Sequence, residues 1–156
     1  MFKLKNKKGV SLIELIVVIG IIGIMAAVSI VSLTKARNET AVEGEADKLV
    51  AVIREAQNYA LTGKSADSEC YRYRVSVSTS GKYSLENIKQ SGEGCSLEYD
   101  YLLDNGVSCV SISSVVFNAP HADVSSTGVI FSLIRGGYTC RVSINSVGLI
   151  TKSCSY

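Results

Sequence analysis

Apolar side chains dominate the first part of the chain almost without interruption. Between Val10 and Leu33 the polar residues are Ser11, Glu14, Ser29 and Ser32. Twenty-four residues in a helix span about 36 Å, which exceeds the hydrocarbon thickness of a bilayer, about 30 Å. The pattern therefore predicts a transmembrane helix over residues 10–33.

A different helical pattern follows over residues 34–64. The apolar residues are spaced by 4, 3, 4, 3 and 4 positions and are Val42, Ala46, Leu49, Ile53, Ala56 and Ala60. This spacing places them in one stripe of a helix. The charged residues Glu39, Glu43, Glu45, Lys48, Arg54 and Glu55 are expected on its other faces. The segment is predicted to be an amphipathic continuation of the first helix that packs on a globular domain, with Gly63 near its end.

The hydrophobic period changes to two in residues 65–156, which predicts a globular, β-rich domain of four to seven strands. The expected strands cover residues 71–78, 83–88, 97–103, 107–117, 129–133, 138–145 and 149–154. Asp104-Asn105-Gly106 predicts a hairpin that pairs 97–103 with 107–117. The fold class is α+β, with a long N-terminal helix packed on an antiparallel β-sheet domain.

Charge is distributed unevenly along the 156 residues, although the net charge is only +2. The first eight residues contain four lysines and no acid. By the positive-inside rule we expect this end in the cytoplasm and the residues after about Leu33 outside. Met25-Ala26-Ala27 could serve as the cleavage site of an ordinary signal peptide. Glu14 argues against that interpretation, because a carboxylate in hydrocarbon costs about 2.5–3.5 kcal/mol and gains nothing in a plain export signal.

The residues from Lys7 to Ile16 read KKGVSLIELI. They resemble the type III leader junction of type IV prepilins and type II secretion pseudopilins. The resemblance implies that residues 1–9 form a leader, that prepilin peptidase cleaves between Gly9 and Val10, and that it methylates the new amine of Val10. It also implies that Glu14 is the acid used in filament assembly. Two positions depart from the family pattern: Val10 replaces the usual Phe or Met, and Val31 replaces the Pro of many major pilins.

A second resemblance covers parts of the β-rich domain. Residues 116–120, 126–131 and 140–148 are similar to the C-terminal domain of H-type minor pseudopilins, as is the helical segment 48–61. This similarity implies a minor subunit. Some related minor pilins bind DNA during natural transformation through basic residues around the last hairpin. Here that region contains only Lys152, with Arg135 and Arg141 earlier, and phosphate binding needs several cations. Nucleic acid is therefore not the expected partner.

The five cysteines all follow the apolar segment, and none forms a CxxC zinc motif. This arrangement is typical of an exported domain that oxidises, although buried reduced thiols are an alternative. A three-residue loop at 146–148 places Cys140 opposite Cys154, so these two are expected to form a disulfide. For Cys70, Cys95 and Cys109 the pairing stays open. Cys70 with Cys95 is preferred, because a hairpin around residue 81 brings their strand ends together.

A few other side chains are of types that can carry chemistry. His121 is the sole histidine, without a recognised Cys/His spacing for catalysis, and it is expected in a loop. Glu43, Glu45 and Asp47 could bind calcium, but a solvated helix face is the expected arrangement. The run Tyr71-Arg72-Tyr73-Arg74 could stack on nucleic acid, but it fits a strand with aromatic residues on one face and arginines on the other. We expect no enzymatic activity, no cofactor and no metal.

The sequence therefore predicts a structural subunit of a type IV pilus-like or type II secretion pseudopilus filament. Expected partners are other pilin or pseudopilin subunits, prepilin peptidase, the inner-membrane assembly platform and, before assembly, the lipid bilayer. The expected location is the cytoplasmic membrane, with the leader inside and the C-terminal domain outside, and later an extracytoplasmic filament. The alternatives are a DNA-binding minor pilin and an unprocessed single-pass membrane anchor for a β domain.

Overall fold

The computed structural model describes residues 9–64, 66, 68–78, 81–111, 113–125 and 128–156. Its elements are α1 (Leu12–Thr62), β1 (Cys70–Val77), β2 (Lys82–Lys89), β3 (Gly94–Leu102), β4 (Ser108–Cys109), β5 (Ser113–Asn118), β6 (Asp123–Val124), β7 (Val129–Arg135), β8 (Tyr138–Ile144) and β9 (Ile150–Ser155). The chain divides into two compact units, residues 1–37 and 38–156. One long N-terminal helix followed by antiparallel sheets confirms the predicted α+β, pilin-like fold.

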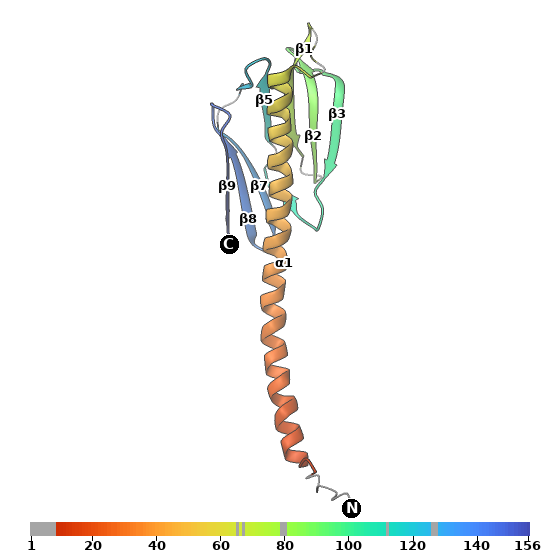
Figure 1. Ribbon diagram of the computed structural model, residues 1–156, viewed down its shortest axis with the longest axis vertical. Helices are drawn as coiled ribbons and strands as arrows, with labels where there is room; N and C mark the ends of the chain where they lie inside the picture. The colour runs from red at the N-terminus through yellow and green to blue at the C-terminus, as the bar shows by residue number, and fades with distance from the viewer. Residues whose placement is uncertain (1–8, 65, 67, 79–80, 112, 126–127) are drawn as a thin grey trace, which may run out of the picture. The chain divides into compact units, whose positions relative to one another are not determined.

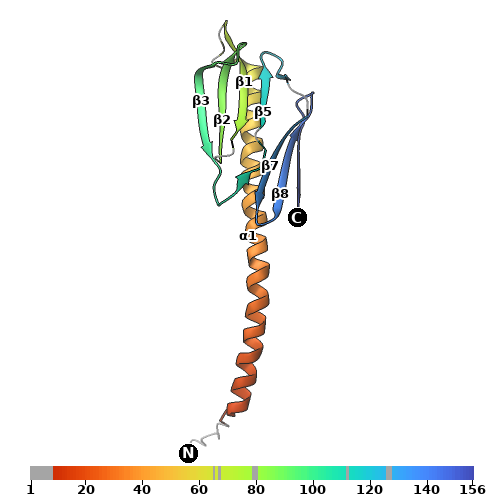
Figure 2. The same cartoon turned by 180° about the vertical axis from the view of Figure 1, so that it is seen from behind.

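The unit of residues 38–156 contains two antiparallel sheets and the second half of α1. Their strand orders are β3-β2-β1-β5-β6 and β4-β7-β8-β9. Figures 1 and 2, seen from opposite sides, show the two sheets side by side along the same side of this part of the helix. The predicted stripe of α1 faces them, and all six of its residues are fully buried (Val42, Ala46, Leu49, Ile53, Ala56 and Ala60). The helical period thus fixes which face of the helix enters the core.

The buried face of α1 is wider than the predicted stripe. Glu45, Val52 and Tyr59 are also buried, seven residues apart along the flank of the stripe. Two adjoining sheets cover a broader arc of the helix than a single stripe needs. The assignment of Glu45 to a solvated face is therefore wrong, because its side chain is only 1% exposed.

The hairpin predicted at Asp104-Asn105-Gly106 is also wrong. The turn itself forms, with a positive φ at Asn105 and Gly106 and a 3.1 Å hydrogen bond from the Val107 N–H to the Asp104 carbonyl. However, β3 pairs with β2, whereas β4 pairs with β7 in the other sheet. The turn therefore carries the chain from one sheet to the other.

Strand number differs from the expectation as well. The predicted strand 107–117 is divided into β4 and β5, which belong to different sheets. A two-residue strand, β6, pairs with the end of β5. The described residues thus contain nine strands rather than four to seven, two of them only two residues long.

Candidate functional site

The N-terminal unit begins its helix close to the predicted leader junction. The Ser11 carbonyl accepts a 3.1 Å hydrogen bond from the Leu15 N–H, and α1 starts at the next residue, Leu12. Glu14 lies in the first turn. A carboxylate there is favoured by the partial positive charge of the free N–H groups at a helix start. Gly9 and Val10 precede the helix and are exposed. Residues 1–8 of the predicted leader lie outside the described residues.

The apolar surface of this unit is not covered by the chain. Every side chain from residue 9 to 37 is exposed, including the valines, isoleucines and leucines of residues 10–33. A helix that is hydrophobic on all sides requires an apolar environment, which is either a membrane or a packed assembly. By length and composition α1 is able to cross a membrane. The exposed segment around Glu14 is therefore the candidate functional site.

Two disulfides bring together the predicted cysteines of the β-rich unit. Cys140 pairs with Cys154 across β8 and β9, with a Cα–Cα distance of 4.1 Å. Cys70 pairs with Cys95, with a Cα–Cα distance of 6.4 Å. Cys109 is a buried free thiol that lies 3.0 Å from the Ser111 carbonyl oxygen. The two disulfides link β1 to β3 and β8 to β9.

The carboxylates of Glu43, Glu45 and Asp47 do not converge on one point, because each has a different partner. Glu43 accepts a 2.7 Å hydrogen bond from the Tyr138 hydroxyl, Glu45 contacts Lys48, and Asp47 pairs with Lys152. His121 is exposed, beyond the end of β5. Across the described ranges no group of three or more His, Cys, Asp or Glu side chains is placed to hold a metal ion.

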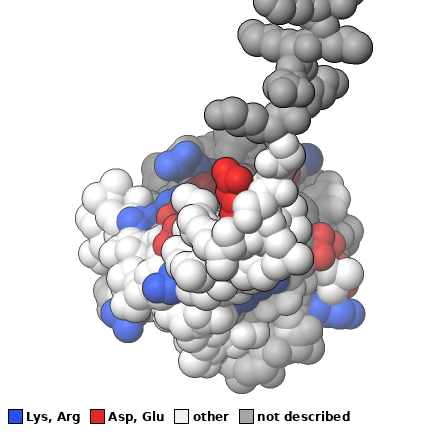
Figure 3. Space-filling model, turned by 90° about the horizontal axis from the view of Figure 1, so that it is seen from below, with Lys and Arg blue, Asp and Glu red and all other residues white. Residues whose placement is uncertain are grey.

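The arginines of β1 are engaged rather than free for nucleic acid. Arg72 donates to the side chain of Asn118 at 2.9 Å, and Arg74 donates to Glu86 at 2.8 Å. Tyr73 is fully buried, so it cannot stack on a base. On the face drawn in Figure 3, acidic and basic side chains are interspersed.

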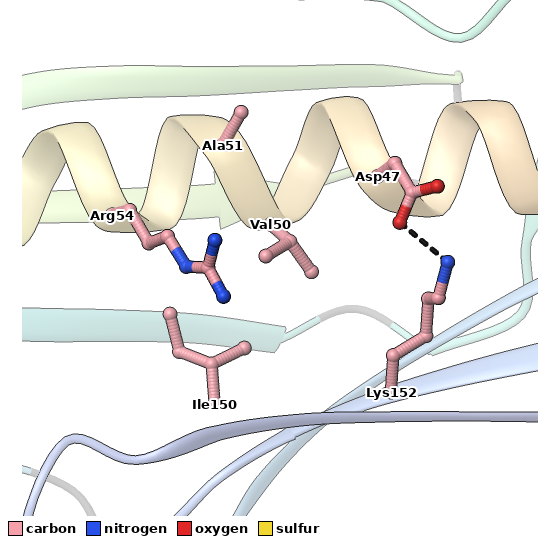
Figure 4. Close-up of a pocket in the computed structure, with 6 residues that line it drawn as sticks. All are labelled: Asp47, Val50, Ala51, Arg54, Ile150 and Lys152. Carbon is pink, nitrogen blue, oxygen red and sulfur yellow. Dashed lines mark hydrogen bonds and ion pairs between the residues drawn. The ribbon is translucent and has the colours of Figure 1, made fainter.

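A cleft that no sequence pattern predicts lies between α1 and β9. Its volume is about 380 Å³, and it is lined by Asp47, Val50, Ala51, Arg54, Ile150 and Lys152 (Figure 4). Lys152 is ion-paired with Asp47 across it. The cleft depends on contacts between residues about a hundred positions apart, for which the sequence gives no local signal.

Two tyrosines of the β-rich unit, Tyr138 and Tyr156, have raised pKa values. The hydrogen bond to Glu43 is the main cause that raises the pKa of Tyr138 to about 12, and burial adds to it. The ring of Tyr156 packs edge-on against Tyr138, with ring centroids 4.9 Å apart. The end of the chain is thereby fixed beside the helix.

The N-terminal segment is similar to a known protein family. Residues 4–30 match the family model described as the prokaryotic N-terminal methylation motif. No curated protein and no solved structure matches the chain at a significant level. The motif supports a type IV pilin or pseudopilin precursor, suggests a structural rather than an enzymatic protein, and suggests a membrane anchor. The match confirms the resemblance seen in residues 7–16: the chain carries the N-terminal motif of the type IV pilin and pseudopilin family on a pilin-like α+β fold.

Proposed function

We propose that the protein is a structural subunit, and a minor one, of a type IV pilus-like or type II secretion pseudopilus filament. The observation that carries this proposal is the methylation motif at residues 4–30, which includes the start of an apolar helix that is exposed on all sides. Lipid covers this helix before assembly and neighbouring subunits cover it afterwards. The minor role rests on the similarity of the β-rich domain to H-type pseudopilins.

Processing creates the charge that the assembly uses. In this proposal, prepilin peptidase at the membrane removes residues 1–9 and methylates the new α-amine of Val10. Glu14 of one subunit neutralises that amine on a neighbour. Opposite charges attract strongly in apolar surroundings, but each loses its hydration. The pair therefore selects the register of assembly more than it adds net stability.

Mass spectrometry of the mature N-terminus tests processing. We expect a chain that begins with methylated Val10. Gly9→Val is expected to accumulate precursor, because a side chain next to the scissile bond obstructs the peptidase. A Cβ on Gly9 meets no atom of the described residues within 4 Å, so we expect the substitution to leave the fold of the precursor unchanged. Gly20→Val is the matched control, since its Cβ also meets nothing. Normal maturation of Gly9→Val would contradict the proposed junction.

The role of Glu14 is tested with one variant that removes its negative charge and one that keeps it. Glu14→Gln removes the charge at constant size, so we expect normal membrane insertion but loss of the subunit from sheared filaments. Glu14→Asp keeps the charge and is expected to retain part of the incorporation. Both variants are compared in cells that lack the wild-type copy. Normal incorporation of Glu14→Gln would refute the pairing argument.

A further inference from the structure

The last strand leaves one long edge of the second sheet open. β9 is the final strand in the order β4-β7-β8-β9, so within the described chain only β8 pairs with it. The pairing runs without a bulge from Ile144 and Ile150 to Thr139 and Ser155. Such an edge presents a row of unpaired backbone groups that another strand can use.

The register identifies which backbone groups point outward. The Asn145 N–H donates to the Leu149 carbonyl at 3.1 Å, so these two form a hydrogen-bonded pair. Antiparallel pairs alternate, which makes Ile150, Lys152 and Cys154 the non-hydrogen-bonded positions toward β8. The Cα–Cα distance of 4.1 Å across the disulfide of Cys154 agrees with this, because such pairs lie near 4.5 Å. The N–H and C=O groups of these three residues therefore face the open edge.

The cleft of Figure 4 lies directly beside this edge. Val50 and Ile150 are half-buried and form an aliphatic floor, and the small side chain of Ala51 leaves room above the helix. At one end Asp47 and Lys152 neutralise each other. At the other end Arg54 is exposed, and its guanidinium has no hydrogen bond or ion pair to any described residue. The cleft thus offers an apolar surface and one uncompensated positive charge.

The edge lacks the usual protection against pairing. Proline, bulges and lysine side chains normally block exposed edges. β9 contains no proline, and its one lysine, Lys152, points toward the helix and is held by Asp47. The ion pair removes the charge that would otherwise repel an incoming strand.

We propose that the open edge of β9 binds an extended segment of a neighbouring filament subunit. The segment adds as a fifth strand and places an aliphatic side chain over Val50 and a carboxylate, two residues away, on Arg54. Side chains on the same side of a strand are about 6.8 Å apart, close to the rise of about 6 Å between positions 50 and 54 of the helix. This inference rests on the proposed function, since a filament supplies the neighbour.

Hydrogen exchange at single-amide resolution tests the pairing on the full processed chain. The chain in detergent micelles is compared with the chain assembled in filaments. The amides of Ile150, Lys152 and Cys154 are expected to exchange about 2- to 12-fold more slowly in filaments, which is the effect of one added hydrogen bond. The amides of Thr151 and Ser153 already bond to β8 and serve as internal controls. Unchanged rates at the three edge amides, with the subunit present in filaments, overturn this inference alone. Absence of the subunit from filaments overturns both proposals.

Two matched variant pairs provide a second readout. Lys152→Pro removes an edge N–H that β8 does not use, whereas Lys152→Ala removes the same ion pair and keeps that N–H. We expect several-fold less incorporation for Lys152→Pro than for Lys152→Ala. Arg54→Glu is expected to reduce incorporation, while Arg141→Glu, on the outer face of the same sheet, leaves it unchanged. Thermal unfolding verifies that each variant folds. Equal incorporation within both pairs contradicts the proposal.

Discussion

Substitution of Glu45 tests how the helix packs, because the carboxylate is buried and only one of its two oxygen atoms has a hydrogen-bond partner. The Oε1 atom lies 2.8 Å from the Lys48 Nζ, whereas Oε2 has no hydrogen-bond partner among the described residues. A buried acceptor without a partner costs about 1–3 kcal/mol. Methionine has a similar length and flexibility, and it carries no such penalty. We therefore expect Glu45→Met to stabilise the protein by about 1–3 kcal/mol.

Substitution of the partner should have the opposite effect. Lys48→Met leaves the buried carboxylate of Glu45 without its cation, so it should destabilise the protein. The double variant, with methionine at both positions, should be about as stable as Glu45→Met alone. Thermal unfolding in detergent measures all three, with about 3–5 °C expected per kcal/mol for a unit of this size.

A nearby tyrosine reports the same charges independently. Burial is the main cause that raises the pKa of Tyr83; the negative charge of Glu45 raises it further, and the positive charge of Lys48 lowers it. Glu45→Met should therefore lower the pKa of Tyr83, and Lys48→Met should raise it. Ultraviolet titration with a Tyr83→Phe reference detects both. Loss of stability in Glu45→Met, or stability shifts of the same sign in both single variants, would refute the reasoning.

Three further predictions concern the β-rich unit. Joint replacement of Cys140 and Cys154 by alanine should cost about 3 kcal/mol in denaturant unfolding, the chain-entropy value for a loop of about 15 residues. Gly148→Ala and Gly137→Ala should each cost about 1–2 kcal/mol, because both glycines have a positive φ (79° and 86°). Gly148→Ala should cost more in the same assay, since its Cβ would also lie 3.0 Å from a helix glutamine. Finally, the raised pKa of Tyr138, about 12 against an ordinary value of 10, stabilises the fold fully below pH 10, and this contribution is lost as pH rises toward 12. When the free energy of unfolding is measured against pH, Tyr138→Phe should therefore lose less stability between pH 10 and 12 than the wild-type protein.

Local patterns in the sequence predict where helices, strands and turns form. Which strands pair, and which helix residues are buried, depends on contacts between residues far apart in the chain. The six-residue stripe of α1 follows from period alone. Glu45 lies three and four residues from stripe positions, and its burial depends on two sheets that meet over the helix. Similarly, Asn105-Gly106 predicts the turn correctly, because a positive φ is a local property. The strand that follows, β4, pairs with the distant strand β7, so the predicted hairpin is not formed.

The candidate sites divide in the same way. The motif around Glu14 is contiguous and could be recognised directly from the chain. The cleft beside β9 joins Arg54 to Ile150, and no short motif encodes that meeting. Counting outward from the loop at 146–148 aligned Cys140 with Cys154, because a tight hairpin makes a long-range pairing local in sequence.

Both disulfides have a mechanical consequence. Each links strand to strand, and neither joins a sheet to α1. When tension is applied along the helix, the load passes into the sheets through side-chain packing, through a few polar contacts such as those of Glu43 and Asp47, and through the backbone that joins Thr62 to Cys70. Apolar contacts arranged along the pulling direction fail together in shear. Under force the helix should therefore slide along the sheets before either cross-linked sheet unravels. Both sheets should then stay intact, joined to the helix by the backbone, and able to pack on it again.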